Sequence, residues 1–148
     1  MTVDSATVAP VIRSVHVRRN AEDAFRVFTD RIADWWPLAT HSCFEENAAG
    51  VAFVEGRLVE RSSSGDEAEW GVVDVWEPPT RIAFSWHPGH PSERATRVEV
   101  VFEPDADGTR VVLTHTGWDI LGSDASGTRE NYNSGWVVVL QRYVDAPA

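Results

Sequence analysis

The stretch WGVVDVWEPPTRIAFSW, residues 70–86, has the composition of two strands and the turn between them. Both halves are rich in valine, isoleucine and aromatic residues, which favour β-strands. Pro78 and Pro79 separate the halves, and two prolines cannot be part of a central hydrogen-bonded ladder. A connection this short joins antiparallel strands. The stretch therefore predicts two neighbouring strands of an antiparallel sheet.

Strand patterns continue on both sides of this pair. VAFVE and RLVERS, within residues 51–62, flank Gly56 and predict a hairpin, whereas residues 38–50 have no periodicity and predict a loop. Residues 96–104 and 109–118 alternate apolar and polar side chains, as strands with one buried face do. The predicted inward residues of these two strands are Val98, Val100, Phe102, Val111, Leu113 and His115.

A strand and two helices are expected before these strands. The strand, residues 11–18, leads to Asn20, which is a favourable N-cap for a helix over residues 21–30. A second, short helix is expected to start after an Asp30 cap and to end at Pro37.

The last segment predicts a long helix over residues 126–144. Its apolar stripe at helical spacing consists of Tyr132, Trp136, Val139, Leu140 and Tyr143. Gly135 interrupts the pattern and costs about 1 kcal/mol relative to alanine. We expect a glycine there because the helix backbone would approach the sheet closely.

Together these elements predict an α+β fold. The order is one strand, two helices, about six strands and the long C-terminal helix. A strongly bent antiparallel sheet wrapped around this helix would bury every apolar face. It would also leave a space, because one cylinder cannot fill a concave surface. Residues 1–10 are expected to be a flexible tail, and residues 11–148 a single domain.

Charge and hydropathy exclude several classes of partner. The 148 residues include 23 acidic and 13 basic ones, all arginine, which gives a net charge of −10. This charge repels phosphate backbones, so nucleic acid is not an expected partner. No apolar run is long enough for a membrane span, and residues 1–10 lack the features of a signal peptide, so a cytoplasmic protein without membrane contact is expected. Cys43 is the lone cysteine, so no intrachain disulfide is expected.

The chain resembles a known family across residues 11–144. The motifs that carry the resemblance are AEDAFRVFTD followed by WWP, WGVVDVWEPPTRIAFSW, GTRVVLTHTGW and YNSGW. They are similar to those of activator-of-heat-shock-protein-ATPase-like (AHSA-like) proteins, which belong to the SRPBCC or START-like superfamily. The resemblance implies a helix-grip fold. Similar proteins bind hydrophobic ligands, act as polyketide cyclases or aromatases, or serve as co-chaperone modules, and the motifs are landmarks of the fold that do not distinguish these roles.

The aromatic content is the main indication of function. Seven tryptophans in 148 residues exceed average usage, and they predict either a large core or an aromatic cavity between sheet and C-terminal helix. We expect the cavity to bind a small apolar or aromatic molecule. The candidate ligand-binding residues are Trp36, Phe84, Trp86, His115, Trp118, Tyr132 and Trp136. Arg13 and Cys43 are further candidates for polar contacts.

The directions of four tryptophan side chains can be predicted from their positions in a helix or strand. Trp35 and Trp36 diverge by about 100° on a helix. Trp35 is therefore predicted to pack against the phenylalanines of the first helix, and Trp36 to face the mouth of the cavity. Trp70 and Trp76 share a strand parity that points outward unless a β-bulge breaks the count. Pointing outward, they would form an apolar patch for self-association into a homodimer.

Catalytic and metal-binding patterns are weak in this sequence. His87 and His90 belong to a Pro-Gly segment that is expected to be an exposed loop, and no matching second pair of ligands exists, so no metal or cofactor is expected. His115 and Tyr132 are the only candidate pair for acid–base catalysis. His115 is expected to face inward and to stay neutral near pH 7. The sequence favours ligand binding without catalysis. A cyclase or aromatase, and a co-chaperone-like interaction module with a closed cavity, are the alternatives.

Overall fold

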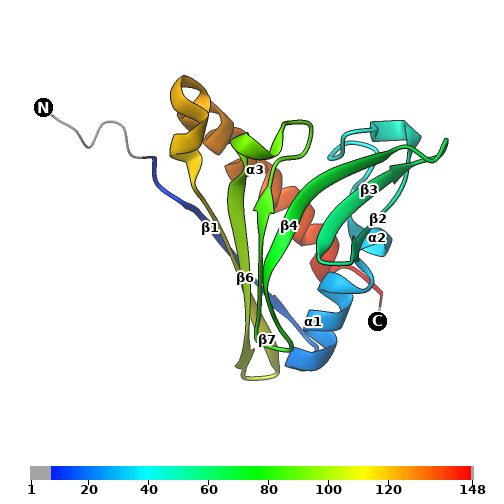
Figure 1. The fold of residues 1–148 in the computed structure, drawn as a ribbon. Helices are drawn as coiled ribbons and strands as arrows, with labels where there is room; N and C mark the ends of the chain where they lie inside the picture. Colours follow the sequence, from blue (N-terminus) through cyan, green and yellow to red (C-terminus); the bar gives the residue numbers. More distant parts are fainter. Residues whose placement is uncertain (1–7, 148) are drawn as a thin grey trace, which may run out of the picture.

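Residues 70–86 lie at the centre of a seven-stranded antiparallel sheet, which has the order β1-β7-β6-β5-β4-β3-β2 (Figure 1). The computed structural model describes residues 8–147, so residues 1–7 of the expected tail lie outside the described part. The strands are β1 (Val11–Val17), β2 (Ala48–Val54), β3 (Arg57–Ser62), β4 (Glu67–Glu77), β5 (Arg81–Trp86), β6 (Thr96–Asp105) and β7 (Gly108–Thr116). The α-helices are α1 (Ala21–Thr29), α2 (Ile32–Trp35) and α3 (Ala125–Val144), and short 3₁₀ helices span Glu45–Asn47, Ser92–Arg94 and Trp118–Asp124. The predicted α+β fold with a helix-grip architecture is confirmed.

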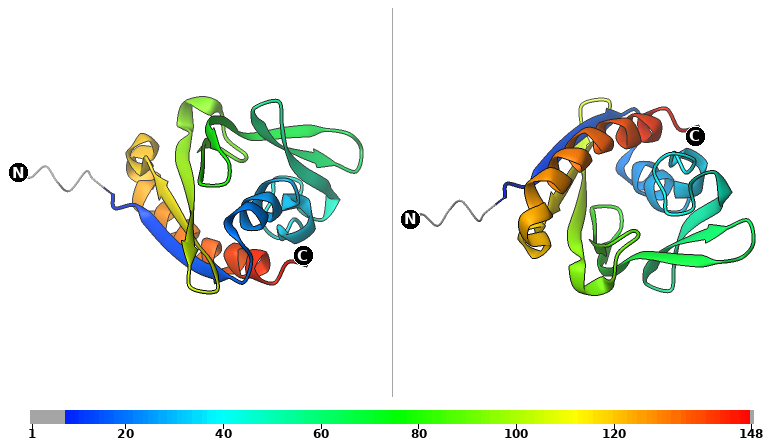
Figure 2. Two further views of the ribbon diagram at one scale, coloured as in Figure 1. Left: turned by 90° about the horizontal axis from the view of Figure 1, so that it is seen from below. Right: turned by 90° about the horizontal axis from the view of Figure 1, so that it is seen from above.

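The sheet curls around α3, which runs alongside β1 (Figure 2). The Arg13 side chain of β1 donates a 3.0 Å hydrogen bond to the main-chain carbonyl of Asn133 in α3. Arg129 donates from α3 to the carbonyls of Ala9 and Pro10, at 3.1 and 2.9 Å. Arg13 therefore ties the first strand to the last helix, although it was a candidate for contacting the ligand.

Strand β4 is the strand through which the sheet continues from β3 to β5. The first half of β4 pairs with β3 and the second half with β5, and a register shift separates Val73 from Val75. A Cβ on Gly71 would lie 1.6 Å from the carbonyl oxygen of Ser85 in β5. No side chain fits in that space, so glycine lets β4 and β5 approach each other at this point.

Both tryptophans of β4 lie on the inner face of the sheet. Trp70 is only 1% exposed, and its indole nitrogen donates to Glu60 at 2.9 Å. Trp76 is 45% exposed and packs edge-on against Phe25 of α1, with ring centroids 5.4 Å apart. Trp76 pairs with the fully buried Ile82 of β5, so it also lies on the inner face of the sheet. The outward direction expected from parity is thus wrong for both tryptophans, and the alternative of a β-bulge is confirmed.

Of the two N-caps predicted for the first two helices, one is present in the structure and the other is not. The Asn20 side chain accepts a 2.8 Å hydrogen bond from the Asp23 amide, which confirms the predicted N-cap of α1. Asp30 was expected to cap the second helix, and this is wrong. Its backbone N–H instead bonds to the Arg26 carbonyl at the end of α1, and α2 begins at Ile32 without a side-chain cap.

Helix α1 packs between the sheet and the C-terminal end of α3. Phe28 contacts Phe102 of β6 and Tyr143 of α3, with ring centroids 5.8 and 5.1 Å apart. The Tyr143 hydroxyl donates a 2.7 Å hydrogen bond to the Ala24 carbonyl. These contacts fix α1 and α3 relative to each other and form one side of the core.

The predicted apolar stripe of α3 faces the sheet. Trp136, Val139, Leu140 and Tyr143 are all buried. The reason expected for Gly135 is wrong, because a Cβ added there would have no atom within 4 Å outside the adjacent helix backbone. Among the described residues, no helix combines the length and the apolar character that crossing a membrane requires.

Candidate ligand-binding site

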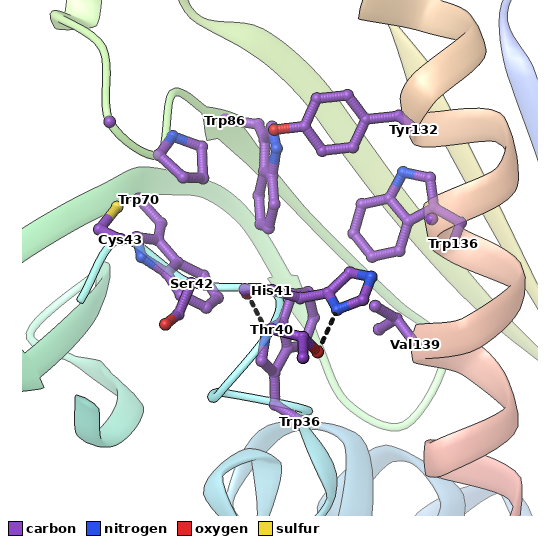
Figure 3. A pocket seen from close by; sticks show the side chains of 13 residues that line it. Trp36, Thr40, His41, Ser42, Cys43, Trp70, Trp86, Tyr132, Trp136 and Val139 are labelled. Atoms are coloured by element: carbon purple, nitrogen blue, oxygen red, sulfur yellow. Dashed lines mark hydrogen bonds between the residues drawn. The ribbon is translucent and has the colours of Figure 1, made fainter. Parts of the chain in front are cut away.

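A cavity of about 340 Å³ lies between α3, the strands β4 and β5, and the segment that follows α2 (Figure 3). Three parts of the chain that are distant in sequence therefore contribute to its wall. The lining residues are Trp36, Thr40, His41, Ser42, Cys43, Trp70, Trp86, Pro88, Gly89, Tyr132, Gly135, Trp136 and Val139.

Four indole rings form the main apolar wall. Trp36 lies next to Trp70, with ring centroids 5.0 Å apart, and next to Trp136, at 5.8 Å. Trp86 completes the set, at 5.5 Å from Trp70 and 5.4 Å from Trp136. Each of the four is at most 6% exposed. Tilted and edge-on contacts at these separations favour the cluster beyond simple burial, so the wall is a mutually supported aromatic surface.

The neighbouring residues Trp35 and Trp36 have the different surroundings that were predicted. Trp35 packs on Phe28 of α1, with centroids 5.2 Å apart, and its indole nitrogen donates to the Val27 carbonyl at 2.8 Å. Trp36 faces the cavity, and its indole nitrogen donates to the His41 carbonyl at 2.7 Å. Trp36 therefore also holds the segment that covers one side of the cavity.

Glu60 of β3 anchors the far end of that segment. Its carboxylate accepts from the amides of Cys43 and Phe44, at 2.7 and 3.0 Å, and from the Trp70 indole at 2.9 Å. The side chain is fully buried, and these three donors compensate for the loss of water. Sequence reasoning did not single out Glu60, because a glutamate inside a strand gives no sign of burial.

The cavity-lining groups with a shifted pKa are held in their neutral forms. Burial, reinforced by the charge of Glu60, raises the pKa of the Cys43 thiol to about 11. Burial also raises the pKa of the Tyr132 hydroxyl, and the nearby Trp86 indole partly opposes this shift. A thiol with such a pKa is a weak nucleophile near pH 7. Both groups are therefore neutral hydrogen-bonding partners for a ligand.

His115 is fully buried behind the cavity wall, with both ring nitrogens engaged. Its Nδ1 accepts a 3.0 Å hydrogen bond from the Trp136 indole, which can only donate. The proton must then be on Nε2, which donates to the Thr96 hydroxyl at 2.6 Å, and that hydroxyl donates to the Trp86 carbonyl at 3.2 Å. Burial lowers the pKa of His115 to about 3. The expectation that His115 faces inward and is neutral is confirmed, and neither nitrogen is free to exchange a proton with a ligand.

Tyr132 and Trp86 provide a polar end to the cavity. The Tyr132 hydroxyl points toward the Trp86 indole (Figure 3). The indole nitrogen of Trp86 is nevertheless the one buried side-chain polar atom, within residues 8–147, that lacks a hydrogen-bond partner. An unsatisfied buried donor is costly in a folded protein, so this end of the cavity favours a group that accepts hydrogen bonds.

The sequence matches the model of a known protein family over most of its length. The family model of the Activator of Hsp90 ATPase homolog 1-like proteins (AHSA1) matches residues 18–145. The chain belongs to this family. The AHSA1 family is part of the SRPBCC superfamily, so the resemblance seen in the sequence motifs is confirmed. Among curated proteins, none matches the sequence.

Solved structures with the same fold include a synthase, a resistance protein and an AHSA1-like protein. An anthrahydroquino-γ-pyrone synthase, Txn09, complexed with SUM, is 33% identical, with 97% of this chain and 91% of that chain aligned and a TM-score of 0.56. The self-sacrificing resistance protein CalC from Micromonospora echinospora is 24% identical, with 92% of each chain aligned and a TM-score of 0.69. An AHSA1-like protein from Aeromonas hydrophila is 20% identical, with 93% of this chain and 90% of that chain aligned and a TM-score of 0.65. The fold of this AHSA1-family chain fits hydrophobic ligand binding.

The seven candidate residues from the sequence fall into two groups in this AHSA1-family structure. Trp36, Trp86, Tyr132 and Trp136 line the cavity. Phe84, His115 and Trp118 are buried behind it, where Trp118 stacks on His115 with centroids 4.1 Å apart. The lining residues that were not predicted lie mainly in loops, whose lack of periodicity gives no indication of a wall.

The histidines of the Pro-Gly segment have different surroundings. His90 is exposed, but His87 is buried, and the expectation of an exposed loop is wrong for it. Its ring nitrogens lie 2.8 Å from the His90 carbonyl and 3.0 Å from the Glu69 carboxylate. His87 thus fixes the loop that contributes Pro88 and Gly89 to the cavity. Within residues 8–147, no three His, Cys, Asp or Glu side chains are close enough together to hold a metal ion.

Proposed function

We propose that this protein binds a small, neutral, planar aromatic molecule in the cavity between the sheet and α3. The observation that carries the proposal is the ring of four buried indoles around a space of about 340 Å³. Small-molecule sites are typically apolar cavities above about 300 Å³ with few polar groups. Aromatic walls select flat ligands, because stacking adds to the hydrophobic gain.

The polar end of the cavity supports a ligand that carries an oxygen. Tyr132 provides a neutral hydroxyl, and the indole nitrogen of Trp86 lacks a partner. A hydroxyl and an indole nitrogen can both donate hydrogen bonds, so Tyr132 and Trp86 can both donate to a carbonyl or phenol oxygen of a ligand. The 33% identical neighbour is named as a synthase of an anthrahydroquino-γ-pyrone, which is a polycyclic aromatic of this kind.

A cyclase-type enzyme acting on such a molecule is the second candidate, and the name of that neighbour favours it. His115 is unsuited to acid–base chemistry because both its nitrogens are engaged away from the cavity. Tyr132, His41 and Cys43 are the remaining groups at the wall that can transfer protons. Turnover of a bound polycyclic compound, followed by mass spectrometry, separates this candidate from simple binding.

Tryptophan fluorescence provides a direct test of binding. We expect 1,4-dihydroxyanthraquinone to quench the emission of the protein with a saturable curve, because four of the seven tryptophans line the cavity. The variant Trp36→Ala removes one wall and should weaken binding by about tenfold, an affinity change of roughly 1.4 kcal/mol. The matched control is Trp76→Ala, at an indole outside the cavity, which should bind normally. Equal binding by both variants would contradict the proposal.

A further inference from the structure

Gly135 occupies the middle of the α3 face that borders the cavity. Tyr132, three residues earlier, and Val139, four residues later, both line the cavity, and positions with this spacing share one helix face. Gly135 is itself a lining residue. A Cβ added at Gly135 would have no atom within 4 Å outside the adjacent helix backbone. The wall between the two side chains is therefore bare backbone.

Neither the backbone conformation nor the packing requires a glycine at position 135. The residue lies inside the 20-residue helix α3, and its φ is outside the left-handed region. No part of the sheet approaches it closely enough to exclude a side chain. Glycine within a helix is unfavourable relative to alanine. The structural consequence of Gly135 is therefore open space on the cavity side of the helix.

We propose that Gly135 sets the size of the ligand, a role that rests on the proposed function. The indoles of Trp86 and Trp136 offer faces for stacking, whereas the bare backbone at Gly135 admits the edge of a flat molecule. A ligand of three fused rings reaches this backbone. A ligand of two fused rings is held by the indoles and does not need the space. Any side chain at position 135 therefore restricts the site to smaller ring systems.

Two probes of different size test the proposal on the full-length protein. Binding of 1,4-dihydroxyanthraquinone, with three rings, is compared with binding of 2-naphthol, with two, by isothermal titration calorimetry. We expect Gly135→Leu to weaken binding of the three-ring probe by at least about tenfold and to change that of the two-ring probe by less than about threefold. Gly135→Ala should weaken the three-ring probe by about threefold.

Gly127 provides the matched control on the same helix. A Cβ added there also has no atom within 4 Å outside the adjacent helix backbone, but Gly127 is not a cavity-lining residue. Gly127→Leu should therefore leave the affinity for both probes unchanged. Thermal unfolding supplies an independent readout, because Gly135→Ala should raise the midpoint by roughly 2–4 °C through helix propensity while it weakens binding. If Gly135 had a packing role, Gly135→Ala would lower both the unfolding midpoint and the affinity for the probe.

The outcomes separate this inference from the proposed function. Equal weakening of both probes by Gly135→Leu, no weakening at all, or a lower unfolding midpoint for Gly135→Ala would overturn the role of Gly135. If Gly135→Leu does not fold, the alanine variant decides the question through the same comparison. A wild-type protein that binds neither probe would overturn the proposed function and this inference together.

Discussion

At the residue scale, one peptide bond between Trp35 and Trp36 separates a structural side chain from a cavity wall. Trp35 is enclosed by α1 and α3, with Phe28 and Tyr143 at centroid distances of 5.2 and 5.1 Å. We expect Trp35→Ala to lower the free energy of unfolding by about 3–5 kcal/mol, as for other large truncations in cores. Trp36→Ala should cost less, because the adjacent cavity already lacks packing atoms on one side. Urea unfolding measures both values.

Binding of the apolar dye ANS provides the second readout for this pair. Trp36→Ala should alter ANS fluorescence in the folded protein, whereas Trp35→Ala should not alter it below its unfolding transition. Equal losses of stability, with no change in dye binding for either variant, would mean that both rings are simply core residues.

The pKa of His115 predicts a specific dependence of stability on pH. In the folded protein this pKa is lowered to about 3, while in the unfolded chain it returns to about 6.5. Between these values the unfolded state binds the proton and the folded state does not. Stability must therefore fall as pH decreases, by up to about 1.4 kcal/mol per pH unit from this group. Above about pH 6.5 the group contributes no slope.

Unfolding by urea between pH 4 and pH 7 measures this effect. The control is His115→Gln, which lacks the titrating group and keeps a side chain able to donate and accept hydrogen bonds. The difference in slope between the two proteins isolates the histidine from the acidic residues. Parallel slopes for wild type and variant would show that the pKa of His115 is the same in the folded and the unfolded protein, and would contradict the lowered pKa.

At the element scale, the close approach of β4 to β5 depends on the absence of a side chain at Gly71. A Cβ there would lie 1.6 Å from the Ser85 carbonyl, which belongs to the backbone of β5 and cannot rotate away. We expect Gly71→Ala to lower the free energy of unfolding by about 3 kcal/mol, because the strands must separate. The matched control is Gly50→Ala in β2, where nothing lies within 4 Å. Denaturant unfolding compares them, and equal stability of the two variants would contradict the steric role of Gly71.

Periodic elements could be predicted from sequence because one side of each faces the core. The alternation of Val98, Val100 and Phe102 and the stripe of α3 correspond to buried residues in the structure. The β4 tryptophans show the limit of this reasoning, since the bulge in β4 reverses a parity that assumes a regular strand. Such bulges depend on contacts between strands that a single segment does not reveal.

For the candidate site, too, several lining residues on helices and strands could be predicted, whereas most of those in loops could not. Tyr132, Trp136 and Trp86 lie on periodic elements, and aromatic content alone placed them near a cavity. The segment after α2 has no periodicity, and its position depends on the hydrogen bonds of the buried Glu60. The sequence predicts a close approach of the sheet at Gly135, and the structure shows open space there instead. The sequence of a helix does not reveal which parts of its surface border a cavity.

At the scale of the whole molecule, the charge and the cavity have separate consequences. The net charge of −10 makes the surface acidic. The cavity groups with a shifted pKa, Cys43 and Tyr132, are instead neutral near pH 7. A ligand that carries negative charge would meet a repulsive surface and gain no compensating cation among these groups. The whole molecule therefore favours neutral ligands over anionic ones.

A bound ligand would connect three parts of the fold: α3, the β4–β5 pair and the segment that follows α2. Since it binds only the folded protein, it must raise stability by about 2.7 kcal/mol at a concentration 100 times its dissociation constant. For a chain of this size, that corresponds to a rise of roughly 5–10 °C in the midpoint of thermal unfolding. Differential scanning fluorimetry with 1,4-dihydroxyanthraquinone measures the shift. Gly127→Leu should show the full shift and Gly135→Leu a much smaller one, because only the latter fills the cavity. A shift of equal size in both variants would place the ligand outside the cavity, since a site elsewhere would not respond to a side chain at position 135.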